Sequence, residues 1–267
     1  LFGLLPKTKA ISHQALEQYL ASLPDSIELS ILAERYDGEL LFEKEADKSV
    51  PSASIIKVPI LLALMRKVEK GEIGWEEPYI LKSEDIVGGA GTIQSLEIGT
   101  PLTIEQLAKA MISLSDNTAT NILIRTVGMD NINSLLRKLN LTQTTLQREM
   151  MDFEAVKAGR QNYTCASDMN RIFTLLLDQE ILSVRWTNQA VALLKGCEDR
   201  ATIPRMLPPS VQIAHKSGSL AYFRGDSGII FAKEGPIILS IFVEKFDSSE
   251  QAEEIIGTIA KLILEWE

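Results

Sequence analysis

Apolar residues recur at helical spacing along several stretches of the chain. Between residues 11 and 23, Leu16, Tyr19, Leu20 and Leu23 lie three or four positions apart, which predicts an amphipathic helix. The same pattern predicts helices over Val58–Val68, Ile104–Ser113, Asn117–Val127, Met129–Leu139, Ala166–Leu177 and Ser183–Leu194. A closing helix is predicted over Ser248–Trp266, with Ser248 or Ser249 as its N-cap.

Strand-like segments stand near both ends of the sequence. Ser26–Tyr36 and Glu39–Glu43 flank Asp37-Gly38, a dipeptide that favours a hairpin turn. Near the other end, three runs are strand-like: Val211–His215, Gly228–Ala232 and Ile237–Val243. Lys233-Glu234-Gly235 is the predicted turn between the last two. The sequence therefore predicts strands at the two ends and helices between them.

This order predicts an α/β fold with two lobes. Residues 1–50 and 196–267 are expected to form an α/β lobe, in which one antiparallel sheet is flanked by the terminal helices. Residues 51–195 are expected to form an all-α lobe inserted into it. A ligand site is then expected where the two lobes meet.

Composition and charge exclude several classes of partner. The net charge of −9 and a pI near 5.0 argue against nucleic acid and anionic membranes, which require a basic patch. The longest mainly apolar runs, Val58–Met65 and Pro236–Val243, are too short to span a bilayer.

The chain begins at Leu1 and no signal peptide is visible. Cys165 and Cys197 form no metal-like cluster and are expected to be buried thiols, so no cofactor is expected.

Three short polar motifs follow one another in the chain. They are Ser54-Ile-Ile-Lys57, which is the only S-x-x-K, then Ser115-Asp116-Asn117, and finally Lys216-Ser217-Gly218. Together they supply a serine nucleophile, two lysines, a second hydroxyl and a strand edge. These groups are sufficient for acyl transfer without a histidine.

The first motif predicts a serine with a lysine base. Ser54 and Lys57 are three residues apart, so one helical turn brings them onto the same face. Serine needs a base, and Lys57 can serve only when neutral, although the reference pKa of lysine is about 10.4. Burial and the charge of Lys216 would lower that pKa. Ser52 as N-cap would leave the Ser54 N–H for an oxyanion, and Pro59 predicts a kink or a tighter turn before it.

The other two motifs each have a catalytic and a structural interpretation. Ser115 can relay a proton and Asn117 can bind a substrate amide, whereas Asp116 is expected to be structural, as a helix cap. The third motif is predicted to end an apolar strand. There the Ser219 N–H can be a second oxyanion donor, and Gly218 would allow the close approach of substrate. The structural alternatives are a helix cap and a basic strand end.

The segment Gly225-Asp226-Ser227-Gly228 superficially resembles the nucleophile motif of trypsin-like proteases. That mechanism needs a paired histidine and aspartate. His13 is expected on an exposed helix face, and His215 should point to the opposite side of its strand from Lys216. We therefore reject the trypsin interpretation, and no motif for metal or nucleotide chemistry is present.

The three motifs resemble those of the class A serine β-lactamases and related penicillin-recognising enzymes, as do Asp116–Asn121 and Arg224–Ile230. The resemblance covers nearly the whole chain and implies a β-lactamase/transpeptidase-like fold and a periplasmic or secreted hydrolase. The roles it implies are Ser54 as the acylated nucleophile, Lys57 as its base, Ser115 as proton relay, and substrate binding by Asn117, Lys216, Ser217, Gly218 and Ser219. We expect a monomer that acts on a small-molecule β-lactam or a D-alanyl peptide.

One departure from the family concerns the base of deacylation. Class A enzymes carry a glutamate two residues after an arginine, and with Arg148 as that arginine the position is Met150. The aspartate that normally pairs with the arginine is also absent, since Asn162 and Tyr163 stand there. Glu154 occupies the place of a family asparagine and is our candidate base, because residues four apart share a face where the loop turns helical. Glu149 and Asp152 are lesser candidates, and all three can equally be solvated loop acids.

A second departure concerns the arginine that helps to bind the substrate carboxylate. The usual position is Asp226 or Ser227 here, so Arg224 or Arg205 is the candidate beside Lys216 and Ser217.

Three functions remain open on these grounds. The first is a β-lactamase that both acylates and deacylates. The second is a D-alanyl peptidase or an esterase with the same nucleophile. The third is a sensor that is acylated once and holds the adduct. The missing glutamate favours the second and third, whereas the resemblance over the whole chain favours the first.

Overall fold

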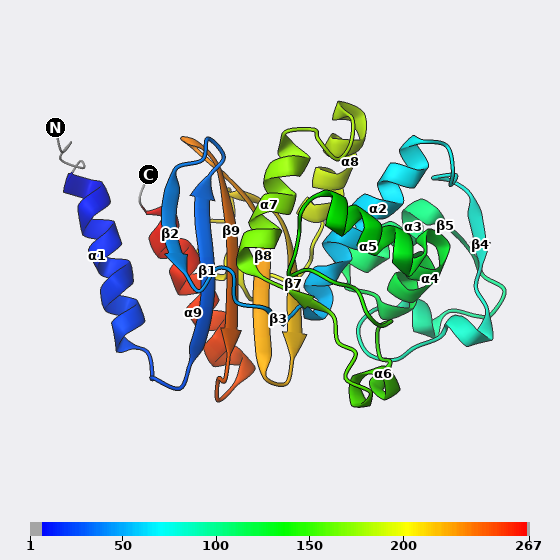
Figure 1. The fold of residues 1–267 in the computed structure, drawn as a ribbon, viewed down its shortest axis with the longest axis horizontal. Helices are drawn as coiled ribbons and strands as arrows, with labels where there is room; N and C mark the ends of the chain where they lie inside the picture. Colours follow the sequence, from blue (N-terminus) through cyan, green and yellow to red (C-terminus); the bar gives the residue numbers. More distant parts are fainter. Residues whose placement is uncertain (1–6, 266–267) are drawn as a thin grey trace.

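The computed structural model describes residues 7–265, with side chains from residue 14 onwards, and places strands from both ends of the sequence in one sheet (Figure 1). The strands are antiparallel, in the order β2-β1-β9-β8-β7. Their bounds are Glu28–Arg35 for β1, Leu40–Lys44 for β2, Gln212–Leu220 for β7, Phe223–Ala232 for β8 and Gly235–Glu244 for β9. The β1–β9 pairing, with Leu29 opposite Val243, joins the strands from the two ends of the chain into one sheet, as predicted.

Both predicted hairpin turns of this sheet are confirmed. Asp37-Gly38 lies between β1 and β2, and Gly38 has a positive φ of 92°, which glycine adopts without strain. The turn at Lys233-Glu234 leads into β9. Strands β7 and β8 are longer than predicted, because polar and glycine residues continue the pairing beyond the apolar runs. Ser219 still lies opposite Arg224.

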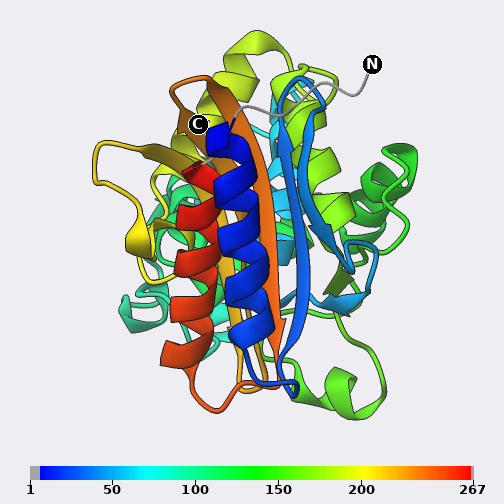
Figure 2. The same cartoon turned by 90° about the vertical axis from the view of Figure 1, so that its left-hand side faces the viewer.

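Helices cover both faces of the sheet. On one face, α1 (Lys7–Ser22) and α9 (Ser249–Leu264) lie side by side (Figure 2). The predicted cap Ser248 accepts a hydrogen bond from the Gln251 N–H at 3.2 Å, and Trp266 lies outside the described residues. The other face is covered by α7 (Ala166–Leu177), which packs against β1, β8 and β9 although it comes from the central segment.

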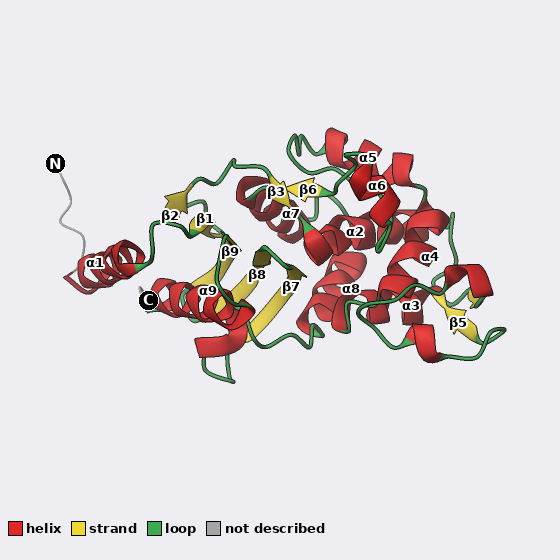
Figure 3. Cartoon of the chain, turned by 90° about the horizontal axis from the view of Figure 1, so that it is seen from below, coloured by secondary structure: helices red, strands yellow, loops and turns green. Residues whose placement is uncertain are grey.

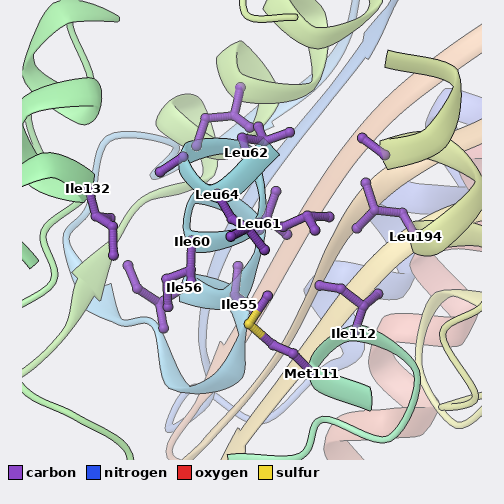
Figure 4. Close-up of a cluster of buried hydrophobic side chains, with 14 of the residues drawn as sticks. Ile55, Ile56, Ile60, Leu61, Leu62, Leu64, Met111, Ile112, Ile132 and Leu194 are labelled. Carbon is purple, nitrogen blue, oxygen red and sulfur yellow. The ribbon is translucent and has the colours of Figure 1, made fainter. Parts of the chain in front are cut away.

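The remaining helices gather around α2 (Lys57–Glu69), as Figures 1 and 3 show. They are α3 (Ile104–Ser113), α4 (Asn117–Val127), α5 (Met129–Lys138) and α8 (Val184–Lys195). Every residue from Lys57 to Met65 is buried. Figure 4 shows why: Leu61 and its neighbours on α2 meet Met111 of α3, Ile132 of α5 and Leu194 of α8. A helix that is apolar all round must be surrounded by protein.

The predicted helix bounds agree with the structure to within one or two residues for the helices from α2 to α8 that were predicted, and those of α3, α4 and α7 are the same. The short elements, apart from the tight turn before Pro59, were not predicted, because two to five residues carry no clear periodicity. The short strands are β3 (Val50–Pro51) with β6 (Tyr163–Thr164), and β4 (Pro78–Ile80) with β5 (Pro101–Thr103). The short helices are α6 (Phe153–Lys157) and the 3₁₀ helices η1 (Ala53–Ile56), η2 (Ser83–Asp85), η3 (Ile93–Ser95) and η4 (Ile203–Met206). Over residues 7–265, no helix combines the length and apolar character that a membrane crossing requires.

The packing around α2 predicts a large cost for removing one of its side chains. We expect Leu61→Ala to lower the free energy of unfolding by about 2–5 kcal/mol, because Leu61 is fully buried and the cavity cannot collapse completely. Leu40→Ala, at a position 54% exposed on β2, is the matched control and should cost less than about 0.5 kcal/mol. Urea unfolding measures both, and equal losses would contradict this account of the core.

Candidate active site

Ser54 lies in a tight turn immediately before the central helix. Residues Ala53–Ile56 form the 3₁₀ helix η1, and α2 begins only at Lys57, so the tighter turn predicted before Pro59 is confirmed. Ser52 occupies the N-cap position, but its side chain makes no capping hydrogen bond. Ala53 has a φ of 45°, a costly conformation for a residue with a Cβ atom. The backbone is therefore strained next to the candidate nucleophile.

The Lys57 side chain is completely buried between the first two motifs. Its Nζ donates to the Ser115 carbonyl at 2.6 Å, to Ser115 Oγ at 3.0 Å and to Asn117 Oδ1 at 3.0 Å. Burial lowers the pKa of Lys57 well below its ordinary value, and the nearby charge of Lys216 lowers it further. Both causes are those predicted from the sequence.

Asp116 fixes the second motif through its backbone contacts. Oδ1 accepts the Ala119 N–H at 2.9 Å, which caps α4, and Oδ2 accepts the N–H groups of Thr92 and Ile93 at 2.7 and 2.8 Å. The predicted structural role of Asp116 is confirmed. Gly91, with a φ of 105°, lies so close that a Cβ atom there would be 2.1 Å from Asp116 Oδ2.

The third motif lies within strand β7, which continues to Leu220 instead of ending at Gly218. Lys216 is buried, and its Nζ donates to the Ser217 carbonyl at 2.8 Å. The prediction that Gly218 leaves room for substrate is corrected. A Cβ atom at Gly218 would lie 3.0 Å from both Ala53 Cβ and the Ser52 carbonyl oxygen, so the glycine lets β7 approach the turn that carries Ser54.

The opposite side of β7 carries a buried ion pair. His215 Nδ1 lies 2.9 Å from Asp226 Oδ2, which also accepts hydrogen bonds from Thr202 Oγ1 and the Ile203 N–H. Burial alone would lower the pKa of His215, but the charge of Asp226 and its hydrogen bond raise it to about 10. Ser227 instead bonds Ser240 at 2.5 Å, away from His215, which supports rejection of the trypsin interpretation.

Arg224 rather than Arg205 lies at the candidate carboxylate site. Arg224 Nη2 is 2.8 Å from Asp199 Oδ2, and Ser217 Oγ donates to the same carboxylate oxygen at 2.5 Å. Arg205 contacts Glu250 and Glu253 on α9 at 3.7 and 3.8 Å. The sequence analysis missed Asp199, which stands in an irregular loop without any motif.

These groups line one cleft of about 380 Å³. Ser54 and Ser115 stand on its helical side, and β7 supplies its other side. The lining residues also include Ala90, Ser113, Leu114, Cys197, Glu198, Asp199, Lys216, Ser217, Gly218, Ser219 and Arg224. Cys197 is buried and free; burial alone would raise its pKa, but His215 and Lys216 lower it overall. Each of the three motifs therefore contributes to a single cavity, whereas Lys57 and Asn117, which are bonded to each other, are not among its lining residues.

Met150 is held by its backbone in the loop that was predicted to supply a base. Its N–H donates to Asn121 Oδ1 at 2.7 Å, and Asn121 Nδ2 donates to its carbonyl at 3.0 Å. Asn162 Oδ1 accepts the N–H groups of Gln147 and Arg148 at 2.7 and 3.0 Å, so an amide orders the segment where the family has an arginine–aspartate pair.

The prediction that Glu154 shares a helical face with Met150 is wrong, because α6 begins at Phe153 and excludes Met150. The Glu154 side chain is 83% exposed and pairs with Lys157. The other two acids are also engaged: Glu149 pairs with Arg125, and Asp152 caps α6. Among the described residues, no group of three or more His, Cys, Asp or Glu side chains could hold a metal ion.

Comparison with known proteins gives concordant matches. A model of the beta-lactamase enzyme family matches residues 13–266. Beta-lactamase VEB-1 of Pseudomonas aeruginosa is 28% identical over 240 residues, which cover 81% of this chain and 77% of that protein. Among solved structures, the beta-lactamase of Sphaerobacter thermophilus DSM 20745 has a TM-score of 0.85 and 26% identity, covering 98% of this chain and 97% of that chain. A mutant of PBP-A, solved as its acyl-enzyme complex with penicillin G, has a TM-score of 0.86 and 23% identity, covering 97% and 98%. This last match concerns the fold.

The His215–Asp226 pair predicts a pH-dependent contribution to stability. The pKa of His215 rises from 6.5 to about 10 in the folded protein, so its contribution is complete below pH 6.5 and is lost as the pH rises through 10. Relative to His215→Asn, the wild-type free energy of unfolding should fall over this range by at most about 1.4 kcal/mol per pH unit. Asp226→Asn is the second variant and should also lose the slope. Urea unfolding from pH 6 to 10 measures it, and parallel curves would contradict a raised pKa.

Proposed function

Because the chain belongs to the beta-lactamase enzyme family, we propose that it is a serine hydrolase of the class A β-lactamase type. It opens the β-lactam amide through an acyl-enzyme on Ser54. The observation that carries this proposal is the fully buried Lys57 amine, which is bonded to Asn117 and to Ser115, and Ser115 lines the same cleft as Ser54. No cofactor takes part in the mechanism.

Lys57 supplies the base in this mechanism. Its lowered pKa favours the neutral amine, which keeps two N–H donors for the Ser115 carbonyl and Asn117 Oδ1. The lone pair then accepts the Ser54 proton as the hydroxyl attacks the lactam carbonyl. Ser115 Oγ, 3.0 Å from Lys57 Nζ, relays a proton to the departing nitrogen.

Two backbone N–H groups stabilise the oxyanion that forms on the lactam carbonyl. The Ser54 N–H stands in the first turn of η1, where helix N–H groups lack an intrahelical partner. The Ser219 N–H on β7 is the second donor, because Gly218 brings this strand against the Ser52–Ile55 turn. Each such preorganised donor typically increases kcat by about 10²–10³-fold.

Slow deacylation is part of the proposal. At the position of the usual glutamate, the Met150 thioether cannot take a proton from water, and the acids of this loop have other partners. This observation also favours two alternative functions. One is a penicillin-binding sensor, and the other is a D-alanyl peptidase or esterase with the same nucleophile. Nitrocefin turnover together with intact mass separates these functions: an adduct that accumulates and decays with slow turnover identifies the proposed β-lactamase, and an adduct that does not decay identifies a trap.

The role of the lysine base predicts slow acylation in Lys57→Arg. We expect the fold to persist but the rate of β-lactam acylation to fall by roughly 100-fold or more, because a guanidinium cannot accept the Ser54 proton. Intact mass spectrometry measures the adduct with time. Ser54→Ala is the control for the site of attachment and should give no adduct; an adduct there would remove Ser54 from the mechanism.

The slow deacylation predicts a gain of function in Met150→Glu. Asn121 holds the backbone of residue 150 on both sides, so a glutamate introduced there inherits a fixed position in the loop. We expect the adduct lifetime to shorten by about tenfold or more, in the range of general-base catalysis. Met151→Glu, at the adjacent and 37% exposed position, is the matched control and should leave the lifetime unchanged. Equal decay in both variants would show that residue 150 does not control the deacylating water.

A further inference from the structure

A carboxylate of the protein itself is bound by Ser217 and Arg224, two of the residues expected to bind the substrate carboxylate. Asp199 lies in the loop between α8 and η4. Its Oδ2 accepts hydrogen bonds from Ser217 Oγ at 2.5 Å and from Arg224 Nη2 at 2.8 Å. The Asp199 side chain is 26% exposed and lines the cleft together with Ser54 and Lys216. A ligand in the cleft therefore meets a site that already holds an anion.

This internal anion is firmly held. Asp199 Oδ1 accepts the Ala201 N–H at 3.0 Å, which anchors the carboxylate to its own loop. Burial would raise the pKa of Asp199, but the Ser217 hydroxyl, Arg224 and the Ala201 N–H together lower it to about 2. Asp199 is consequently ionised at neutral pH, where β-lactam carboxylates are ionised as well.

Arg224, at this end of the cleft, has limited capacity for a further anion. Arg224 also contacts Glu253 Oε1 through Nη2 and Nε, at 3.0 and 3.1 Å, so two carboxylates share its charge. Lys216 is buried, and its Nζ donates to the Ser217 carbonyl. A substrate carboxylate that binds here brings a third negative charge to Arg224. It must displace Asp199 or bind beside it against repulsion.

We propose that Asp199 is a specificity-determining residue that competes with the substrate carboxylate for Ser217 and Arg224. It thereby lowers the reactivity of carboxylate-bearing β-lactams relative to neutral esters. This inference rests on the proposed function. The opposite role, in which Asp199 orders Ser217 and Arg224 to receive the substrate, predicts an effect of the opposite sign.

The test compares benzylpenicillin with its methyl ester in wild type, Asp199→Ala and Asp199→Asn. The readout is the second-order rate constant of acylation, from intact mass spectrometry. Asp199→Ala should increase the rate with the acid by about tenfold or more, because the substrate carboxylate then has no internal competitor for charged hydrogen bonds to Arg224. The rate with the ester should change less than about threefold, because the ester has no carboxylate to bind there. Asp199→Asn keeps an acceptor for Ser217 and should give a smaller gain. Glu198→Gln, an exposed acid of the same cleft, is the charge-matched control and should change both rates alike.

A fall in the acid rate on removal of Asp199, or equal changes for acid and ester, would overturn the competition. Circular dichroism checks the fold, and the isosteric Asp199→Asn decides the question where Asp199→Ala does not fold. Acylation of wild type by the ester supports the proposed function whatever Asp199 does. A second arm needs no acylation: in the Ser54→Ala background, calorimetry should show that Asp199→Asn tightens binding of the acid but not of the ester. Absence of binding by either compound in every variant would overturn both proposals.

Discussion

The arrangement of the site depends on the removal of the Lys57 amine from water. An isolated ammonium in a protein interior costs several kcal/mol, so burial favours the neutral form unless polar partners compensate. Here the partners are two oxygens of Ser115 and one of Asn117, all about 3 Å or less from Nζ. These contacts join the start of α2 to the start of α4, and they require both helices to meet at one point. Burial of a single lysine thus links the fold of the helical region to the chemistry of the cleft.

The surrounding frame tolerates strained backbone at the positions that carry this chemistry. Ala53, just before Ser54, and Ser115 both have a positive φ, which costs of order 1–3 kcal/mol for residues with a Cβ atom. Asp116 compensates around Ser115 with hydrogen bonds to three backbone N–H groups. Gly218 compensates around Ala53 by allowing β7 to pack directly against the turn. The side chains of Ser54 and Ser115 are therefore positioned by neighbours that have no part in the reaction.

The sequence was sufficient to predict the parts of the molecule that repeat or that belong to a motif. Long apolar periodicities predicted α3, α4 and α7 with their observed bounds, and the lowered pKa of Lys57 followed from burial and one neighbouring charge. Contacts across loops were not predictable. The missing side chain of Gly218 was expected to make room for substrate, because nothing in the sequence reveals that Ser52 and Ala53 lie where a Cβ atom would stand. The prediction that Glu154 shares a helical face with Met150 was wrong because the start of α6 depends on the Asp152 cap, which apolar periodicity does not reveal.

Acylation and deacylation depend on different parts of this structure. The groups proposed for acylation lie on η1, at the start of α2, just before α4 and on β7, and the two lysines among them are buried. In the proposed mechanism, deacylation depends on a loop whose course is held by two amide side chains, Asn121 and Asn162, which bind backbone atoms rather than the side chain at residue 150. The Met150 side chain is itself buried in the hydrophobic cluster around α2, so this position presents an apolar group where the family has a carboxylate. In the proposed mechanism, the acylation groups and the deacylation loop thus belong to separate parts of the fold, and the balance between turnover and trapping depends on the side chain at residue 150.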